Sequence, residues 1–597
     1  MKKNLKYIEH LYILLRLVTV SYSLIILITF FSMQTFAQKD TVYVPSDIPP
    51  GEGNLNDSIN AQIGNLSNVV YKLEANGYYV LTDSIYIPEE EHLTIVAPDP
   101  GNTQQTSPPQ ILVTVNSYPS KYFFYSNGDL TIKNIWLLYA ASDEWQRQIS
   151  LQFDNSDETD TLTGIFENVI FDFSGVPQNG GGAVCISSKH FLGSFKNCYF
   201  KNCTDAHFRY YGRAVSFPYN QTGYHIDSLS FENCTFANIG YVYSQQGDWI
   251  SEGQYADNIH FNHCTFLNVV MFSLESGWWY KMSVTNSIFV NTFMFGDIPA
   301  YRHEPNGGTI RIDSVSNFGF EVPFTEQDRR ILFTNSNYFI EDWLADWMKI
   351  NPGSQWLDSL GRYDEIPVPQ PMLNPGTIEF FNSASFPYMN KSNLHDSTDP
   401  GFILHPTNYE KIKDFLEAKW FSAEDYQWAY KPEMSFQRIW PMEEDLSYTN
   451  EVLKTAGMGG FPLGDLYHWF PNEYMQWKAQ EGNENARISY WLNNGQDSIF
   501  TDVKENYDFV KNYKLFQNYP NPFNLTTLIR YSVPKESYTS IKVYNLLGEE
   551  IAVLFEGYQK AGNFTATFDG IGLTSGVYFY QIQAENFIDT KKLILLK

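Results

Sequence analysis

The sequence predicts an all-β-dominated protein with three parts: a stack of short parallel strands, a Trp-rich helical and irregular segment that covers it, and a C-terminal antiparallel β-sandwich. Three observations support this prediction. A short phrase containing Asn recurs through the middle of the chain, nine of the 14 tryptophans fall within residues 341–495, and alternating apolar residues reappear after residue 513. A chain of 597 residues exceeds the roughly 250–300 residues that one core can serve, so several domains are expected.

The composition indicates a folded protein that does not bind nucleic acid. Hydrophobic residues make up 43% of the chain and aromatic residues 17%, which is enough to build cores. The formal charge of −27 argues against a nucleic-acid partner, because phosphates are bound by clustered Lys and Arg. Five cysteines are too few for a disulfide scaffold of this length.

Residues 1–37 are predicted to be a signal peptide. Three lysines among the first six residues precede an apolar run that is densest over residues 24–31, and Thr35 and Ala37 are small residues at the positions that a signal peptidase inspects. The alternative is an uncleaved anchor, since residues 11–33 are long enough to span a bilayer. Because Arg16 interrupts that run, removal of the peptide is favoured.

Between about residues 130 and 340 one phrase recurs: apolar, any, Asn, small or apolar, any, apolar. Its copies are residues 132–137, 166–171, 195–200, 231–236, 261–266, 284–289 and 333–338. Their third residues are 23 to 49 positions apart, as expected for coils joined by loops of different length. Each copy predicts a strand, a bend at the Asn and a second strand. Stacked about 4.8 Å apart, such coils would form an inner Phe column and an Asn ladder.

This pattern resembles the right-handed parallel β-helix of pectate-lyase-like proteins, in which Asn ladders and aromatic stacks recur. The resemblance covers residues 57–340 and implies the fold. It implies little about chemistry, because function on such scaffolds lies in individual sites.

The cysteines follow the same repeat. Cys198, Cys234 and Cys264 hold one place in three successive copies, which predicts a column of buried thiols. The alternative is a zinc site made of His190, Cys198, Cys203 and His207.

Exported β-helix proteins often act on polysaccharides, but the sequence has no complete motif for a polygalacturonase-like hydrolase, a pectin esterase or a Gly-x-Ser-x-Gly hydrolase. A lyase that acts on uronates needs a base and a cation, either Ca²⁺ or Arg or Lys, to neutralise the carboxylate. Arg209 and Glu275 each lie nine residues after the closing Phe of their repeat, which places them on one face. With Lys281 nearby, the catalytic candidates are Arg209, Glu275 and Lys281.

The sequence establishes no cofactor, but a lyase of this kind could use calcium. Its candidate ligands are the carboxylates of Asp248, Glu252 and Asp257, which lie between two copies of the repeat. The alternative is an ordinary solvated face, because any acidic β-helix would present a similar assortment.

Residues 341–495 lack the repeated phrase and are rich in tryptophan. Apolar residues at helical spacing predict two amphipathic helices, over residues 340–347 and 412–420. The segment is expected to cover the open last coil, which would otherwise expose unpaired backbone groups. The alternative is that its tryptophans stack on sugar rings. Asp465 lies in a tight turn for which the sequence suggests no chemistry.

After a polar linker at residues 496–512, alternating strands and Gly turns predict a small β-sandwich over residues 513–597. The Tyr-Pro-Asn-Pro-Phe-Asn opening at 519–524, the turn at 545–549, the Ser-Gly-Val-Tyr-Phe-Tyr run at 575–580 and the Lys-Lys-Leu-Ile-Leu ending at 591–595 resemble the type A C-terminal sorting domain of the type IX secretion system (T9SS), an Ig-like sandwich. This resemblance implies export across the outer membrane and two partners, the type IX translocon and its sorting peptidase.

Together these features predict a T9SS-delivered β-helix protein that is secreted or attached to the cell surface. It is expected to bind an extracellular polysaccharide and, if it is an enzyme, to cleave it as a lyase. The alternative is a non-catalytic adhesin or structural rod.

Overall fold

The computed structural model describes most of the chain from residue 39 to residue 595. The described residues are 39–47, 51–100, 106–113, 122–139, 150–157, 159–173, 182–204, 212–216, 226–244, 255–271, 273–275, 279–294, 308–310, 312, 314–317, 321–350, 371–373, 375–421, 426, 428, 430, 440–497, 513–516, 518, 521, 523, 526–535, 537–546, 548–559, 562–570, 573–585 and 587–595. The predicted signal peptide and most of the predicted linker lie outside them. The chain divides into two compact units, Met1–Asp497 and Ser498–Lys597.

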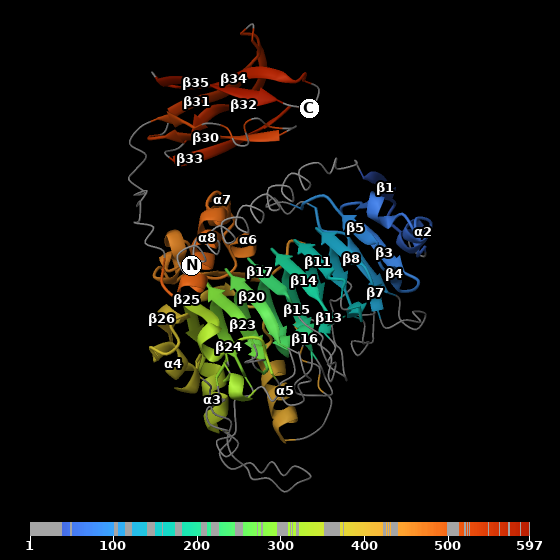
Figure 1. The fold of residues 1–597 in the computed structure, drawn as a ribbon, viewed down its shortest axis with the longest axis vertical. Helices are drawn as coiled ribbons and strands as arrows, with labels where there is room; N and C mark the ends of the chain where they lie inside the picture. Colours follow the sequence, from blue (N-terminus) through green and yellow to red (C-terminus); the bar gives the residue numbers. More distant parts are fainter. Residues whose placement is uncertain are drawn as a thin grey trace, which may run out of the picture. The chain divides into compact units, whose positions relative to one another are not determined.

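The first unit is a parallel β-helix (Figure 1). Its strands come in threes: two successive strands lie in a 19-stranded sheet, here sheet A, and the third lies in a seven-stranded sheet, here sheet B. For example, β11 (Leu162–Glu167), β12 (Ile170–Asp172) and β13 (Gly182–Ser188) make one coil. Each pairs in parallel with its equivalent in the next coil, β14 (Phe191–Lys196), β15 (Tyr199–Cys203) and β16 (Arg213–Ser216).

The other strands continue both sheets in the same order. In sheet A they are β1 (Asp40–Val44), β2 (Val69–Leu73), β3 (Tyr78–Leu81), β5 (His92–Val96), β6 (Gln110–Val113), β8 (Asp129–Lys133), β9 (Trp136–Leu138), β17 (Ser228–Glu232), β18 (Thr235–Ile239), β20 (Ala256–Asn262), β21 (Thr265–Val269), β23 (Trp279–Thr285), β24 (Ile288–Thr292), β25 (Arg330–Phe339) and β26 (Met389–Asp396). In sheet B they are β4 (Ile85–Ile87), β7 (Tyr122–Ser126), β10 (Ser150–Asn155), β19 (Tyr241–Ser244) and β22 (Leu274–Glu275). The right-handed sense of the coils remains a prediction, which rests on the general handedness of parallel crossovers.

The recurrent Asn forms the corner between the two sheet A strands of a coil. The third residue of every copy has a left-handed backbone, with φ between 48° and 61° at Asn134, Asn168, Asn197, Asn233, His263, Asn286 and Asn335. The second Asn series, at residues 202, 238, 268 and 291, has φ between 52° and 58°. Asn tolerates this conformation better than other non-Gly residues, which explains its recurrence at a tight corner.

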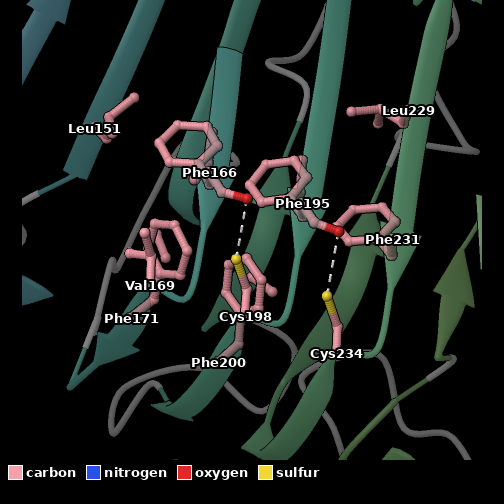
Figure 2. Packing of buried hydrophobic residues seen from close by; sticks show 14 of the residues in the cluster. Leu151, Phe166, Val169, Phe171, Phe195, Cys198, Phe200, Leu229, Phe231 and Cys234 are labelled. Carbon is pink, nitrogen blue, oxygen red and sulfur yellow. Dashed lines mark hydrogen bonds between the residues drawn. The ribbon is translucent and has the colours of Figure 1, made fainter. Parts of the chain in front are cut away.

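Two columns of phenylalanine fill the interior, as the repeat predicts (Figure 2). In the first column the ring centroids of Phe166 and Phe195 are 4.9 Å apart, and those of Phe195 and Phe231 are 4.8 Å apart. In the second column the ring centroids of Phe171 and Phe200 are 4.3 Å apart, and the two rings are nearly parallel. These contacts confirm that the copies lie directly over one another.

The cysteine column is also confirmed. The five cysteines are free and buried. In successive copies Cys198 Sγ donates a hydrogen bond to the carbonyl of Phe166 at 3.5 Å, and Cys234 Sγ donates to that of Phe195 at 3.4 Å (Figure 2). Burial raises the pKa of the Cys198 and Cys264 thiols, which keeps them protonated and unreactive.

The parallel sheet is longer than the sequence repeat. It starts at β1, before residue 57, and continues past residue 340 into β26, which pairs in parallel with β25. Asn393 of β26 faces Asn335 of β25 in this register and has φ 48°. It is therefore an eighth corner, whose flanking positions carry Lys391 and Asp396 instead of aromatic residues.

The remaining elements of this unit are mostly short helices. They are α2 (Asn54–Asn60), η1 (Leu66–Asn68), η3 (Val315–Asn317), η4 (Glu326–Asp328), α3 (Asp342–Ile350), α4 (Pro375–Asn382), α5 (Tyr409–Phe421), η6 (Leu453–Thr455), η7 (Met458–Gly460), α6 (Leu466–Trp469), α7 (Pro471–Lys478) and α8 (Glu481–Asn494), with the hairpin of β27 (Phe402–Leu404) and β28 (Asp445–Tyr448). The helices α3 and α5 form where the apolar spacing predicted them. In the described part of the chain no helix has the length and apolar character needed to cross a bilayer.

Residues 440–494, which we call the strap, lie along the outer face of sheet A. Outward side chains of successive strands, such as Tyr199, Leu267 and Ile288, form a second core with Leu463 and Trp477 of the strap. A different element, the helix α4, packs near the end of the stack. Residues of α4, including Ile378 and Phe381, pack against the inner core. The strap therefore covers the side of the coils, and not only the last coil as the sequence suggested.

The second unit is a two-layer antiparallel sandwich. One sheet contains β29 (Lys514–Leu515), β30 (Thr526–Val533) and β33 (Gly562–Asp569), and the other has the order β32 (Glu550–Gln559), β31 (Ser537–Tyr544), β34 (Gly576–Ala584) and β35 (Phe587–Leu595). Both sheets contribute to one core, with Ile529 and Phe568 from the first and Tyr580 and Leu593 from the second.

Candidate functional site

Exposed aromatic rings gather on the outer face of sheet B. Tyr86 of β4 is in register with Tyr125 of β7, and Tyr125 is in register with Gln152 of β10. The Tyr86 and Tyr125 rings stack with centroids 6.3 Å apart, and the ring of Tyr122 meets that of Tyr125 edge-on at 5.2 Å. Tyr86 is 47% exposed, and the other two rings are partly exposed. We call Tyr86, Tyr122 and Tyr125 the tyrosine row.

A carboxylate fixes the central ring of this row. The hydroxyl of Tyr125 donates to the Asp154 carboxylate on the neighbouring strand. Burial raises the pKa of Tyr125 well above its usual value, and the hydrogen bond and negative charge of Asp154 raise it further. The Asn127 side chain also donates to the Asp154 carbonyl at 2.5 Å. The phenol therefore stays neutral and holds a fixed orientation.

On the later strands of sheet B, the residues in register with Tyr86 and Tyr125 are no longer aromatic. Cys185 follows Gln152, Ser216 follows Cys185, and Ser244 and Glu275 continue the row. Arg213 lies on the preceding outward position of β16, is only 2% exposed and has its guanidinium 5.3 Å from the centroid of the Tyr241 ring. The face thus changes from aromatic at β4 and β7 to polar from β10 onward.

The structure does not bring the predicted catalytic candidates together where it describes them. Glu275 lies at the end of β22 in sheet B, whereas Lys281 lies in β23 of sheet A, in register with Asn258 and Arg330. Arg209 lies outside the described residues. The described residues therefore assign Glu275 and Lys281 to different sheets, and the role of Arg209 stays a prediction.

Lys281 belongs to a cluster at the start of the sheet A strands. Its Nζ atom is 5.4 Å from the centroid of the Tyr280 ring, which stacks on Phe324 at 4.8 Å. Burial lowers the pKa of His260, and the charge of Lys281 lowers it further, to about 4. His260 is thus a neutral imidazole at neutral pH, with Nδ1 2.9 Å from the Ser283 hydroxyl.

The calcium candidates are only partly described. Asp248 and Glu252 lie outside the described residues, and Asp257 is in β20, in register with Tyr280 between the paired Ala256 and Asn258. Within the described ranges no group of three His, Cys, Asp or Glu side chains is arranged to hold a metal ion.

The zinc alternative is not supported by the residues that are described. Cys198 is buried in the core, whereas His190 is partly exposed and pairs with Asp227 at 3.0 Å. His207 lies outside the described residues.

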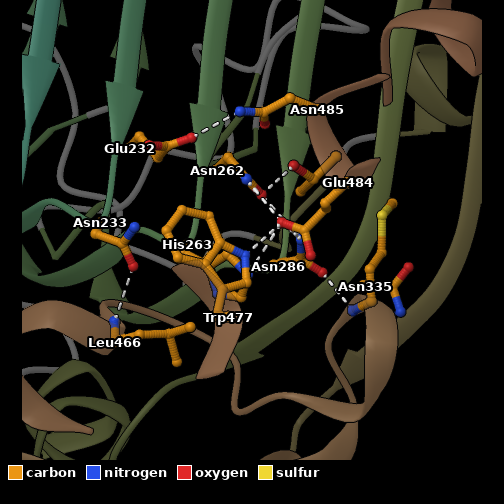
Figure 3. Close-up of polar contacts among 12 residues, drawn as sticks. Glu232, Asn233, Asn262, His263, Asn286, Asn335, Leu466, Trp477, Glu484 and Asn485 are labelled. Carbon is orange, nitrogen blue, oxygen red and sulfur yellow. Dashed lines mark hydrogen bonds and ion pairs between the residues drawn. The ribbon is translucent and has the colours of Figure 1, made fainter. Parts of the chain in front are cut away.

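A buried polar network joins the strap to the corner ladder (Figure 3). Glu484 of α8 is 4% exposed. Its Oε1 atom accepts hydrogen bonds from Asn262 Nδ2 at 2.9 Å, Trp477 Nε1 at 3.0 Å and Asn286 Nδ2 at 3.3 Å, and lies 3.2 Å from His263 Nε2. Burial acts to raise the pKa of Glu484, but the charge of His263 and these hydrogen bonds outweigh it, so the pKa is lowered. The carboxylate is structural, because it is sealed from solvent.

Asp465 has a similar anchoring role, which the sequence did not reveal. It caps α6 by accepting from His468 N, and its Oδ2 accepts from the Thr235 hydroxyl at 2.7 Å. Its backbone N–H donates to Thr265 Oγ1 at 3.0 Å. The residue therefore ties the strap to two adjacent coils.

Three of the strap tryptophans are unavailable to ligands. The exposed fractions of Trp469, Trp477 and Trp491 are 8%, 0% and 9%, and each belongs to an apolar cluster. Their function is packing, whereas the tyrosine row leaves part of its aromatic surface exposed. The repeat did not point to that row, because its strands precede the first copy of the phrase. The stretch Tyr122-Phe-Phe-Tyr125-Ser does not alternate polar and apolar residues, so it gave no signal either.

A second buried cluster joins the strap to β15, the second strand of one coil. Lys201 Nζ lies 2.6 Å from Glu444 Oε1, which also accepts from the Tyr199 hydroxyl at 3.2 Å. Burial raises the pKa of the neighbouring Asp172 to about 6, against the opposing effects of Lys201 and Asn202.

Comparison with known families identifies the second unit. Residues 517–596 match the family described as the secretion system C-terminal sorting domain. The protein is therefore exported by the type IX system and is secreted or attached to the cell surface. No curated protein matches the chain.

Proposed function

We propose that the β-helix unit is the cargo of this export route and binds an extracellular polysaccharide along the outer face of sheet B. The observation that carries the proposal is the tyrosine row, with Tyr86, Tyr122 and Tyr125 partly exposed and in mutual contact. Aromatic rings of this kind offer flat apolar surfaces beside polar hydroxyls, which suit the faces and edges of sugar rings. Gln152 and Asp154 on the next strand supply polar groups beside them.

Fixed geometry favours binding by this surface. Strand pairing holds the Tyr86 and Tyr125 backbones, and Asp154 holds the Tyr125 hydroxyl. Rings that are already ordered lose little conformational freedom when a ligand binds, so their contact area contributes more fully to affinity.

If the protein is also an enzyme, we propose that it cleaves the bound polysaccharide as a lyase. This reaction requires a base and a cation beside a uronate carboxylate. Glu275, at the end of β22, is the sequence candidate that lies in sheet B, and Ca²⁺ would be the added cation. Incubation of the protein with pectate and alginate in the presence of Ca²⁺ tests this activity. The ultraviolet absorbance of unsaturated sugar ends would establish a lyase.

Binding is tested with the purified chain on a panel of immobilised uronate and neutral polysaccharides. We expect Tyr86→Ala and Tyr125→Ala to weaken binding at least tenfold, since each removes a stacking surface. Tyr43→Ala is the matched control. Tyr43 is 74% exposed on β1 of sheet A, away from the row, so its loss should leave binding unchanged.

Equal binding by all three variants would show that the ligand lies elsewhere. Failure of the wild-type chain to bind any polysaccharide would favour the alternative function, a non-catalytic adhesin or structural rod.

A further inference from the structure

The last strand of the sorting domain lies at the edge of its sheet. In the order β32, β31, β34, β35, the described part of the chain gives the strand β35 a strand neighbour on one side only. The outer side of such a strand carries backbone N–H and C=O groups that can pair with another extended chain.

Part of this outer side is occupied by the beginning of the same domain. Asn521 Oδ1 accepts from the Ile594 N–H at 2.9 Å, and Asn521 Nδ2 donates to the Lys592 carbonyl at 3.1 Å. The Phe523 N–H donates to the Ile594 carbonyl at 2.9 Å. Phe523 also forms a parallel bridge with Leu595. We call residues 521–523 the clasp.

The clasp forms some of the hydrogen bonds that a neighbouring strand would form with β35, but it is not itself a strand. It satisfies edge groups of Lys592 and Ile594 with one side chain and one short parallel bridge, which is far less than the nine residue pairs between β34 and β35. A longer extended segment could replace it and gain more hydrogen bonds. Lys591 and Lys592 in the same strand disfavour pairing between two copies of this domain, because like charges would face each other.

We infer that the outer edge of β35 is a strand-addition surface, and that an extended segment of the type IX machinery pairs with it after displacing the clasp. The type IX machinery is the expected partner because this is a sorting domain. Strand addition is the expected mode of binding because β35 lies at the edge of its sheet. The inference does not rest on polysaccharide binding, so the two can fail separately.

Alternation along β35 shows which residues face the edge. The N–H and C=O of Ile594 are used by the clasp and not by β34, so those of Lys592, Thr590 and Ile588 point to the same side. The backbone N–H and C=O of Lys591 point the other way, to Tyr580 of β34. Proline at an edge-facing position removes an outward donor while the ladder to β34 stays intact.

The test is export of full-length Thr590→Pro in a host with an active type IX system. We expect this variant to accumulate in the periplasm, with at least a tenfold loss of surface and medium protein. Thr590→Ala is the matched control, because both changes remove the hydroxyl that accepts from Gln581 at 2.8 Å, and only proline removes the backbone donor. Thr590→Ala should be exported normally.

Thermal unfolding of the purified full chains shows that the domain still folds. Lys591→Pro, which breaks the ladder to β34, is the reference for a misfolded domain. Ile588→Pro repeats the edge test at a second outward donor. Export of either folded proline variant at the level of Thr590→Ala would overturn the inference.

Discussion

At the scale of single residues, the corners of the β-helix depend on two properties of asparagine. The residue adopts a left-handed backbone at modest cost, and its amide bonds to groups above and below. Asn168 Nδ2 donates to Asn134 Oδ1 at 2.7 Å, and Asn197 Nδ2 donates to Asn168 Oδ1 at 2.9 Å. Toward the later coils the amides turn to the strap instead. Asn286 Oδ1, for example, accepts from Met458 N at 2.8 Å.

These two properties can be separated at Asn286, where φ is 52°. We expect Asn286→Ala and Asn286→Gly both to lower the free energy of unfolding, since both lose the amide contacts. Alanine should be less stable than glycine by about 1–2 kcal/mol, the cost of a left-handed backbone for a residue with a Cβ. Denaturant unfolding of the two variants measures the difference. Equal stability of the two would show that the corner does not constrain φ.

Glu484 makes a pH-dependent contribution to stability. Its pKa is lowered in the folded protein, so its contribution is present above the pKa of an unfolded Glu, about 4.3, and is lost as pH falls through the folded value. Glu484→Ala should cost about 3–5 kcal/mol at pH 7, because it strips the partner from the buried groups around it. Glu484→Gln keeps the shape and an acceptor but not the charge.

The thermal midpoint of Glu484→Gln should lie below that of the wild type at pH 7, and the gap should close below about pH 4. A gap that stays constant from pH 7 to pH 3 would contradict the charge-based account.

At the scale of elements, the strap backbone lies directly against the coils at Gly464. Its N–H donates to the Asn286 carbonyl at 2.7 Å, its φ is 82°, and a Cβ there would lie 2.5 Å from Thr265 Oγ1. Gly464→Ala should therefore destabilise the strap through both backbone strain and a clash. Gly460→Ala is the matched control, because Gly460 has φ 80° and open space around its Cβ position.

We expect Gly464→Ala to be less stable than Gly460→Ala by about 1–3 kcal/mol, the usual cost of overpacking. Hydrogen exchange of strap amides, together with the unfolding midpoint, measures the effect. Similar values for both variants would mean that the strap can move away from Thr265 without loss.

The repeat made the coils from β8 to β25 predictable, because few folds other than a stacked coil place a recurrent Asn corner between two Phe positions. The copy at Asn393 was missed because Lys391 and Asp396 replace its aromatic residues. The sheet B strands carry no fixed phrase, so neither they nor the tyrosine row could be placed from the sequence. The lateral position of the strap depends on contacts such as that of Asp465 with Thr235, which no local pattern encodes.

At the scale of the whole molecule, export and cargo reside in separate units. Deletion of residues 513–597 should leave the fold of the first unit intact, since the unit boundary lies at residue 497. It should also trap the protein in the periplasm, because the sorting domain is missing. Cell fractionation measures the location and thermal unfolding measures the fold. Normal surface display of the truncated chain would refute the sorting role.

The strap also limits how this scaffold can change in length. Within a single stretch of 55 residues (494 − 440 + 1) it contacts Lys196, Glu232, Asn262, Asn286 and Asn335, one from each of five consecutive coils. Solenoids usually grow or shrink by duplicating or deleting repeats. Here a duplicated coil would move every later strap contact along the stack by one strand spacing. The strap, whose length is fixed, could not follow. The strap therefore fixes the number of coils beneath it, and its apolar cluster extends this limit back to Trp136 of β9 and Ile170 of β12.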